Sequence, residues 1–146
     1  MLHDLRELYQ AVILDHAAHP RNQGKLATAT SDQLVHNPSC GDTIHLYLQV
    51  IQGRIAAIEF TGSGCTISQA SASLLTTVIK GKTMQEALTL ADHFSALAMG
   101  QAAPKAGLGD AVILTQVMQF PTRIKCATIS WWALKQAILT EQEEEA

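Results

Sequence analysis

The chain has 146 residues, of which 47% are apolar and 16% are charged, and its net charge at pH 7 is −3. This length suits one domain, and the composition is too apolar and too poor in charge for a disordered protein. The 10 lysine and arginine residues are spread along the chain and form no basic stripe, so we expect no nucleic-acid partner.

The first third of the sequence predicts one helix and one weak strand. Apolar residues recur at helical spacing over residues 2–17, and the proline and glycine of residues 19–24 end that helix. Threonine and valine in residues 26–35 allow an edge strand.

A strand hairpin is the clearest signal that follows. Residues 43–50 alternate between apolar and polar side chains, as a half-buried strand does. Gln52 and Gly53 predict a tight turn into a second, antiparallel strand. The residues predicted to share one face of that second strand are Ala56, Ile58 and Phe60.

The remainder of the chain is predicted to be mainly helical. The predicted elements are a helix over 68–80 ended by Gly81, a helix from Thr83 to about 99 opened by a capping box with Glu86, a loop over 100–109, a short helix ending before Pro121, a helix over 122–140 and a solvated acidic tail over 141–146. Trp131 and Trp132 are predicted to be core residues rather than a partner surface, although an exposed pair would be a candidate for an interaction. The order of helix, strands and then helices predicts a single α+β domain over residues 1–146.

No segment of the sequence predicts a membrane span or a secretory signal. The longest uncharged run, residues 60–79, has 11 glycine, serine, threonine or glutamine residues among its 20 positions. Charged residues appear by position 4, before an apolar signal core could form. We therefore expect a cytoplasmic protein without a membrane partner.

The three cysteines lie where predicted elements begin or end, and they are too few for a disulfide scaffold. Cys40 lies in a turn before the first clear strand, Cys65 between a strand and a helix, and Cys126 in the first turns of the last helix. A free cysteine is most often a small buried hydrophobic residue, but turn residues flank Cys40 and Cys65. Helix N-termini favour the thiolate form, and Arg123 and Lys125 add positive charge beside Cys126.

Three thiolates and a fourth ligand would make a tetrahedral zinc site. Asp42 can supply the fourth ligand, because Gly41 permits a tight turn between it and Cys40. An aspartate after a glycine is also a common turn former. His36 competes with Asp42, because it is the histidine nearest to Cys40, and the spacing alone leaves these alternatives open.

Other catalytic patterns are absent from the sequence. There is no Gly-x-Ser-x-Gly elbow, no phosphate-binding loop of the Walker type and no Gly-x-Gly-x-x-Gly fingerprint. A cysteine–histidine dyad is conceivable, but nothing in the sequence positions a base.

Five segments together resemble the IscU/NifU family of iron–sulfur cluster assembly proteins. They span nearly the whole chain in the family's order, and the three cysteine motifs are highly specific. The segments are YQAVILDH at 9–16, HPRN at 19–22, NPSCGD at 37–42, GSGCTIS at 62–68 and RIKCAT at 123–128.

Two features place the resemblance closest to the SufU branch of this family. IscU-type scaffolds have a histidine just before the third cysteine, whereas this chain has Lys125. SufU-like chains also carry an insertion between the second and third cysteines, and residues from about 100 to 120 resemble it.

The resemblance implies a fold, a metal and a partner. The implied fold is a small three-stranded antiparallel sheet packed against helices. The implied metal is zinc held by Cys40, Asp42, Cys65 and Cys126. The implied partner is a SufS-type cysteine desulfurase, from which Cys40 takes persulfide sulfur for delivery to downstream assembly or acceptor proteins. We expect the protein to act as a monomer.

Two alternatives use the same residues differently. The protein could be a scaffold on which a [2Fe–2S] cluster is built, with iron or the cluster in place of zinc. It could also be a binding protein whose zinc is purely structural. Lys125 and the insertion favour the sulfur carrier.

Overall fold

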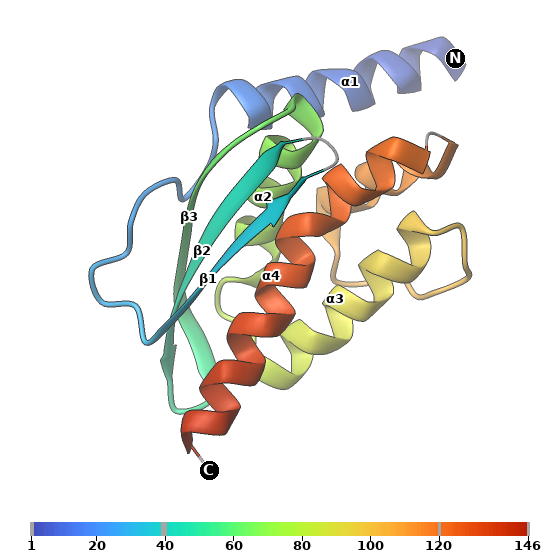
Figure 1. The fold of residues 1–146 in the computed structure, drawn as a ribbon. Helices are drawn as coiled ribbons and strands as arrows, with labels where there is room; N and C mark the ends of the chain where they lie inside the picture. Colours follow the sequence, from blue (N-terminus) through green and yellow to red (C-terminus); the bar gives the residue numbers. More distant parts are fainter. Residues whose placement is uncertain (1, 39–40, 120, 146) are drawn as a thin grey trace.

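The computed structural model describes residues 2–38, 41–119 and 121–145 (Figure 1). Cys40, the predicted sulfur acceptor, therefore lies outside the described residues. In chain order the elements are α1 (Leu2–Ala18), β1 (Ser31–Asn37), β2 (Asp42–Ile51), β3 (Arg54–Ser63), α2 (Thr66–Ile79), α3 (Met84–Ala98), the 3-10 helix η1 (Gly109–Gln119) and α4 (Pro121–Glu145).

The three strands form one antiparallel sheet in the order β1-β2-β3, which confirms the expected fold class. The turn from β2 to β3 is the predicted one. Gln52 and Gly53 have φ angles of +52° and +75°, so both residues are in the left-handed region. A two-residue hairpin loop of this kind follows the right-handed twist of the strands that it joins.

The register of the hairpin contains one irregularity that the alternation did not predict. Gln49 pairs with Ala57 and Val50 pairs with Ile55, so Ala56 is an extra residue in β3. The prediction that Ala56 shares the buried face with Ile58 is therefore wrong: Ala56 is exposed and Ile55 is fully buried. A bulge of this kind shifts the side-chain alternation, because two residues oppose one.

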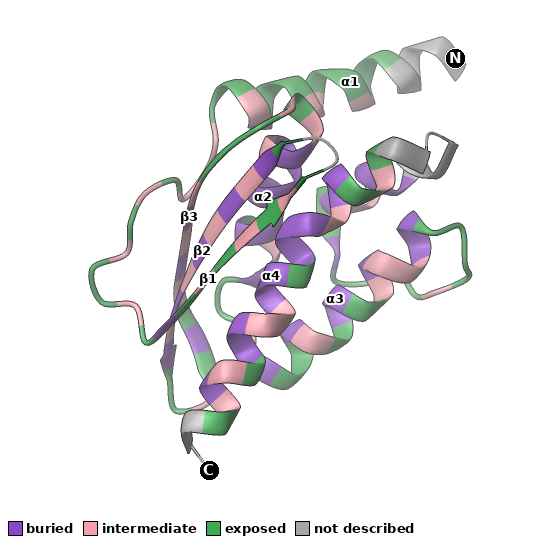
Figure 2. Ribbon diagram, viewed as in Figure 1, coloured by how far each residue is buried: buried purple, intermediate pink, exposed green. Residues whose placement is uncertain are grey.

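Helices cover one face of the sheet, and the core lies between the two layers (Figures 1 and 2). α4 packs against β1 and β2, and α2 packs against β3. Trp131 of α4 is fully buried and stacks on Phe94 of α3 with ring centroids 4.3 Å apart. Trp132 was also predicted to be core, but half of its surface is exposed, because it follows Trp131 directly and faces away from the layer.

The helix boundaries agree with the predicted ones to within a few residues. The capping box at the start of α3 is present, with the Glu86 N–H donating to Thr83 Oγ1 and the Thr83 N–H donating to Glu86 Oε1. The short helix before Pro121 is a 3-10 helix.

The predicted acidic tail is part of the last helix. α4 continues to Glu145, and Glu141 is buried rather than solvated. Thr30 Oγ1 donates a hydrogen bond of 2.9 Å to Glu141 Oε2, which ties the C-terminal end of α4 to the residue before β1. The prediction of a solvated tail is wrong for Glu141, because its partner lies far away in the sequence, whereas Glu143 is exposed as predicted.

His16 joins α1 to α2 from a buried position. Its Nδ1 lies 2.7 Å from Ser73 Oγ, which also accepts a hydrogen bond from the Arg21 N–H. Burial lowers the pKa of His16 below the ordinary value of 6.5, and the charge of Arg21 lowers it further. The folded protein therefore favours the neutral imidazole.

This lowered pKa predicts a loss of stability in weak acid. Where the folded pKa lies below the unfolded one, the unfolded chain binds more protons, so the free energy of unfolding falls as the pH drops below about 6.5 toward the folded-state pKa of His16. Denaturant unfolding between pH 7.5 and 5 measures this slope. His16→Gln should flatten it, and the same change at the exposed His36 serves as the control. An equal slope in wild type and His16→Gln would contradict the assignment.

No helix in the described part of the chain is long and apolar enough to cross a membrane.

Candidate metal centre

Asp42 is the first residue of β2 and is fully buried at the end of the sheet. It pairs with Asn37 across the turn from β1, and Gly41 precedes it with a φ of +73°. The Gly41 N–H donates to the Asn37 carbonyl oxygen at 2.8 Å. The predicted tight turn at Gly41 is thus confirmed, and it brings a carboxylate to the edge of the core.

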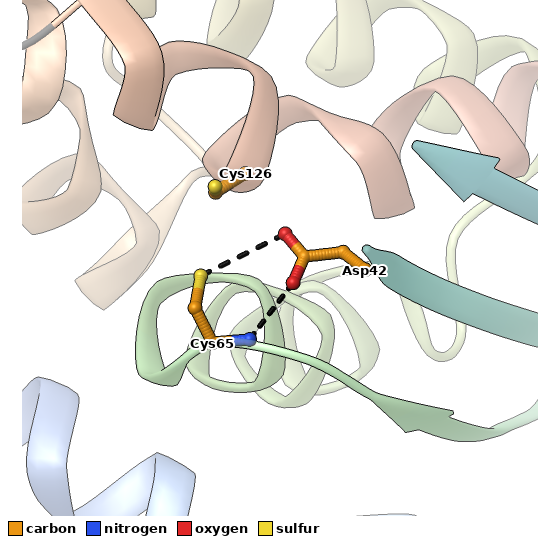
Figure 3. Close-up of side chains that lie close together, drawn as sticks. All are labelled: Asp42, Cys65 and Cys126. Carbon is orange, nitrogen blue, oxygen red and sulfur yellow. Dashed lines mark hydrogen bonds between the residues drawn. The ribbon is translucent and has the colours of Figure 1, made fainter. Parts of the chain in front are cut away.

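Cys65 is the N-cap residue of α2. Its backbone N–H donates a 2.8 Å hydrogen bond to Asp42 Oδ1, and its Sγ lies 3.7 Å from Asp42 Oδ2 (Figure 3). The partial positive charge of the helix N-terminus favours the negative charge of the Asp42 carboxylate at this point.

Cys126 approaches the same point from α4. It lies in the second turn of α4, with 1% of its surface exposed. In Figure 3 its sulfur faces Asp42 and Cys65. The three side chains thus come from the start of a strand, a helix N-cap and the second turn of α4, which are far apart in the sequence.

The ligand atoms of Asp42, Cys65 and Cys126 all lie within 4.8 Å of one another. Two ligands of a tetrahedral zinc ion are about 3.5–3.8 Å apart, given zinc–sulfur and zinc–oxygen bonds of about 2.3 and 2.1 Å. The 3.7 Å from Cys65 Sγ to Asp42 Oδ2 falls in this range. Two thiols and a carboxylate are also donors that zinc accepts, so the residues fit the ion and leave one position for a further ligand.

Gly64 completes the site, and sequence reasoning missed it. A Cβ atom at this residue would lie only 2.0 Å from Asp42 Oδ1 and 2.9 Å from Asp42 Cα. Its φ of +142° is also one that other residues rarely adopt. The available signal in the sequence was a glycine directly before Cys65, the N-cap residue. A backbone that passes this close to a carboxylate needs glycine, because it has no Cβ atom.

The remaining predicted site residues lie around this cluster or outside the described chain. Arg123 and Lys125 are exposed on the first turns of α4. His36, the competing ligand, is exposed on β1, and its Nδ1 lies 2.9 Å from Thr43 Oγ1. The described residues therefore favour Asp42 over His36 as a ligand, and the place of Cys40 stays a prediction.

This combination of a three-stranded sheet, covering helices and a cysteine–aspartate centre defines a known class. The family model of the NifU-like N-terminal domain matches residues 8–139, and the chain belongs to this IscU/NifU family.

Two curated relatives cover nearly the whole chain. A protein of Streptococcus pyogenes named iron-sulfur cluster assembly scaffold protein IscU is 46% identical over 94% of this chain and 86% of its own length. A protein of Bacillus subtilis named zinc-dependent sulfurtransferase SufU is 41% identical over 95% of both chains.

Solved structures agree on the fold. A crystal structure from Fervidobacterium islandicum, described as a putative iron-sulfur cluster assembly scaffold protein for the SUF system, is 32% identical, covers 87% of this chain and 93% of its own, and has a TM-score of 0.84. A NifU-like protein from Brucella abortus shares the fold at 23% identity, with a TM-score of 0.85 over 97% of this chain and 99% of its own.

Proposed function

We propose that this protein serves iron–sulfur cluster assembly as a zinc-dependent sulfur acceptor and carrier that works with a SufS-type cysteine desulfurase. The observation that carries the proposal is the three-ligand cluster of Asp42, Cys65 and Cys126. Cys40 precedes Asp42 by two residues in the sequence, and two peptide units reach at most about 7 Å. A thiol on so short a tether suits the fourth position.

The proposed transfer needs no external oxidant or reductant. The Cys40 thiolate attacks the outer sulfur of the desulfurase persulfide, and a new sulfur–sulfur bond forms on Cys40. The original sulfur–sulfur bond breaks, and the desulfurase cysteine leaves as a thiolate. Bound zinc would keep the thiols deprotonated near neutral pH. The chain's own part is to hold Cys65, Cys126 and Asp42 in place while Cys40 reacts.

Three observations favour a carrier over a cluster scaffold. The residue before Cys126 is Lys125, which offers no imidazole to a cluster. The Bacillus subtilis relative that is similar over almost the full length of both chains is named a zinc-dependent sulfurtransferase. Asp42 also suits a site whose ligand is exchanged, because a carboxylate holds zinc less tightly than a fourth thiolate.

The second candidate is a scaffold for a [2Fe–2S] cluster at the same residues. The name of the Streptococcus pyogenes relative favours it. Cys65, Cys126 and Asp42, together with Cys40, would provide four ligands. Four cysteines are the more common set for such clusters.

Metal content and desulfurase stimulation, measured on one preparation, test these proposals. The carrier should contain about one zinc per chain, stimulate the desulfurase and acquire one extra sulfur on the Cys40 peptide, as read by mass spectrometry after thiol labelling. Cys40→Ala should abolish stimulation and the adduct, with the fold checked by circular dichroism.

Other results would support a different function. A stoichiometric, stable cluster after anaerobic purification would favour the scaffold. Full stimulation by Cys40→Ala, or an adduct on Cys65 or Cys126, would contradict Cys40 as acceptor. Bound zinc without any stimulation of the desulfurase would indicate a purely structural zinc site.

A further inference from the structure

The two outer edges of the sheet differ in their hydrogen bonding. The edge of β3 is covered by other segments: the Gly24 N–H donates to the Phe60 carbonyl oxygen at 2.8 Å, and the Ile55 N–H donates to the Lys82 carbonyl oxygen at 2.8 Å. β1 pairs only with β2, and no other described segment bonds to its backbone over residues 31–36. The outer edge of β1 therefore presents backbone groups that another strand could pair with.

A groove lies beside the end of this open edge. β1 and α4 run alongside each other (Figure 1). The groove lies between the end of β1 and the first half of α4 and has a volume of about 250 Å³. The residues that line it are Val35, His36, Asn37 and Pro38 on one side and Lys125, Thr128, Ile129 and Trp132 on the other. α4 runs opposite to β1, because Lys125 lies near the end of β1 whereas Glu141 contacts Thr30 before its start.

The groove carries one large exposed apolar side chain. Trp132 is 51% exposed and lines the groove. Trp131, its neighbour in the same helix, is fully buried, so the exposure of Trp132 does not come from a loose helix. Tryptophan is the residue type most enriched among those that dominate binding energy at protein interfaces.

The positive charge of the groove favours a partner segment that carries negative charge. Lys125 is the cation in the lining, and the lining contains no aspartate or glutamate. Arg123 is also exposed, but it lies two residues before Lys125, on another face of α4, and does not line the groove. Within the described chain Lys125 forms no hydrogen bond or ion pair, so it is available to a carboxylate of the partner.

We propose that an extended segment of the partner protein binds in this groove as a fourth strand beside β1, with an apolar side chain on Trp132 and a carboxylate near Lys125. Strand addition of this kind takes affinity from backbone hydrogen bonds and specificity from alternate side chains. The proposal rests on the proposed function, in which the partner is the cysteine desulfurase. A segment bound there ends beside the metal centre, because β1 leads into Asp42 and α4 carries Cys126.

Affinity for a SufS-type desulfurase tests the side-chain contacts. Trp132→Ala and Lys125→Glu should each weaken binding at least about tenfold in isothermal titration, and the loss for Lys125→Glu should shrink at high salt. The matched controls are Leu14→Ala, an equally exposed apolar residue on α1, and Lys105→Glu, an exposed lysine in the loop before η1. Both controls should bind as wild type does, and the zinc content of every variant is measured.

Backbone exchange tests the strand pairing. Addition of the desulfurase should protect every second amide of β1 from hydrogen exchange, because only alternate residues point their N–H groups to the open edge. Desulfurase binding without this protection, or unchanged binding by Trp132→Ala and Lys125→Glu, would overturn the proposed binding of a partner strand in the groove. The proposed function would then remain intact. If wild type neither binds nor stimulates the desulfurase, both proposals fall.

Discussion

Zinc binding should weaken by about 100-fold or more when Asp42 is replaced by alanine. Loss of a residue that merely supports a metal ligand lowers the metal affinity about 10–100-fold. Loss of the ligand itself should lower the affinity at least as much. The same change removes the acceptor of the Cys65 N–H, so the metal-free protein should lose about 1–3 kcal/mol in its free energy of unfolding. Competition with a chromophoric chelator and denaturant unfolding in chelator measure the two effects.

Asp42→Asn separates these two roles. The amide oxygen still accepts a hydrogen bond from Cys65, so the metal-free stability should stay close to that of wild type. A neutral amide is a poorer zinc ligand than a carboxylate, so zinc affinity should still fall. Unchanged zinc affinity in both variants would show that Asp42 is not a ligand.

Gly64→Ala should lower the free energy of unfolding by about 3 kcal/mol or more, from a steric overlap and a strained backbone together. The new Cβ would meet the Asp42 carboxylate at 2.0 Å, and the backbone of Asp42 leaves no room for it to move aside. For a domain of this size the midpoint of thermal unfolding should fall by about 10 °C. Because Asp42 must shift, zinc affinity should fall as well.

Gly53→Ala is the matched control for this substitution. Gly53 has a φ of +75° in the hairpin turn, but no atom lies within 4 Å of a Cβ built there. The control should therefore show only the cost of the left-handed backbone, about 1–2 kcal/mol, with normal zinc affinity. Equal effects of the two alanines on stability and on zinc affinity would show that Gly64 has no special relation to Asp42.

Local patterns were enough to predict most of the fold. The Gln52-Gly53 turn and the Thr83–Glu86 capping box depend on neighbouring residues alone, and both are present. Ala56 was misplaced, because a bulge is decided by pairing with another strand. A run of glutamates is typical of solvated chain, but Glu141 is buried where the end of α4 meets Thr30.

The residue types of the candidate metal centre could be predicted from the sequence, but their arrangement in space could not. Turn residues around Cys40 and Cys65 indicated a site, but spacing left Asp42 and His36 as competing ligands. The strand pairing favours Asp42, because Asp42 begins β2 and is fully buried, whereas His36 is exposed on β1. Gly64 was missed because its role depends on how closely two distant segments approach each other.

The origin of the three ligands in separate parts of the chain has a consequence for folding. In the proposed zinc form the ion would connect the sheet, the start of α2 and the buried helix α4, as a removable cross-link does. An ion that binds the folded state alone adds stability that grows with the free zinc concentration. Because Cys65, Cys126 and Asp42 would keep their places while Cys40 reacts, the same cross-link would hold α4 against the sheet throughout sulfur transfer.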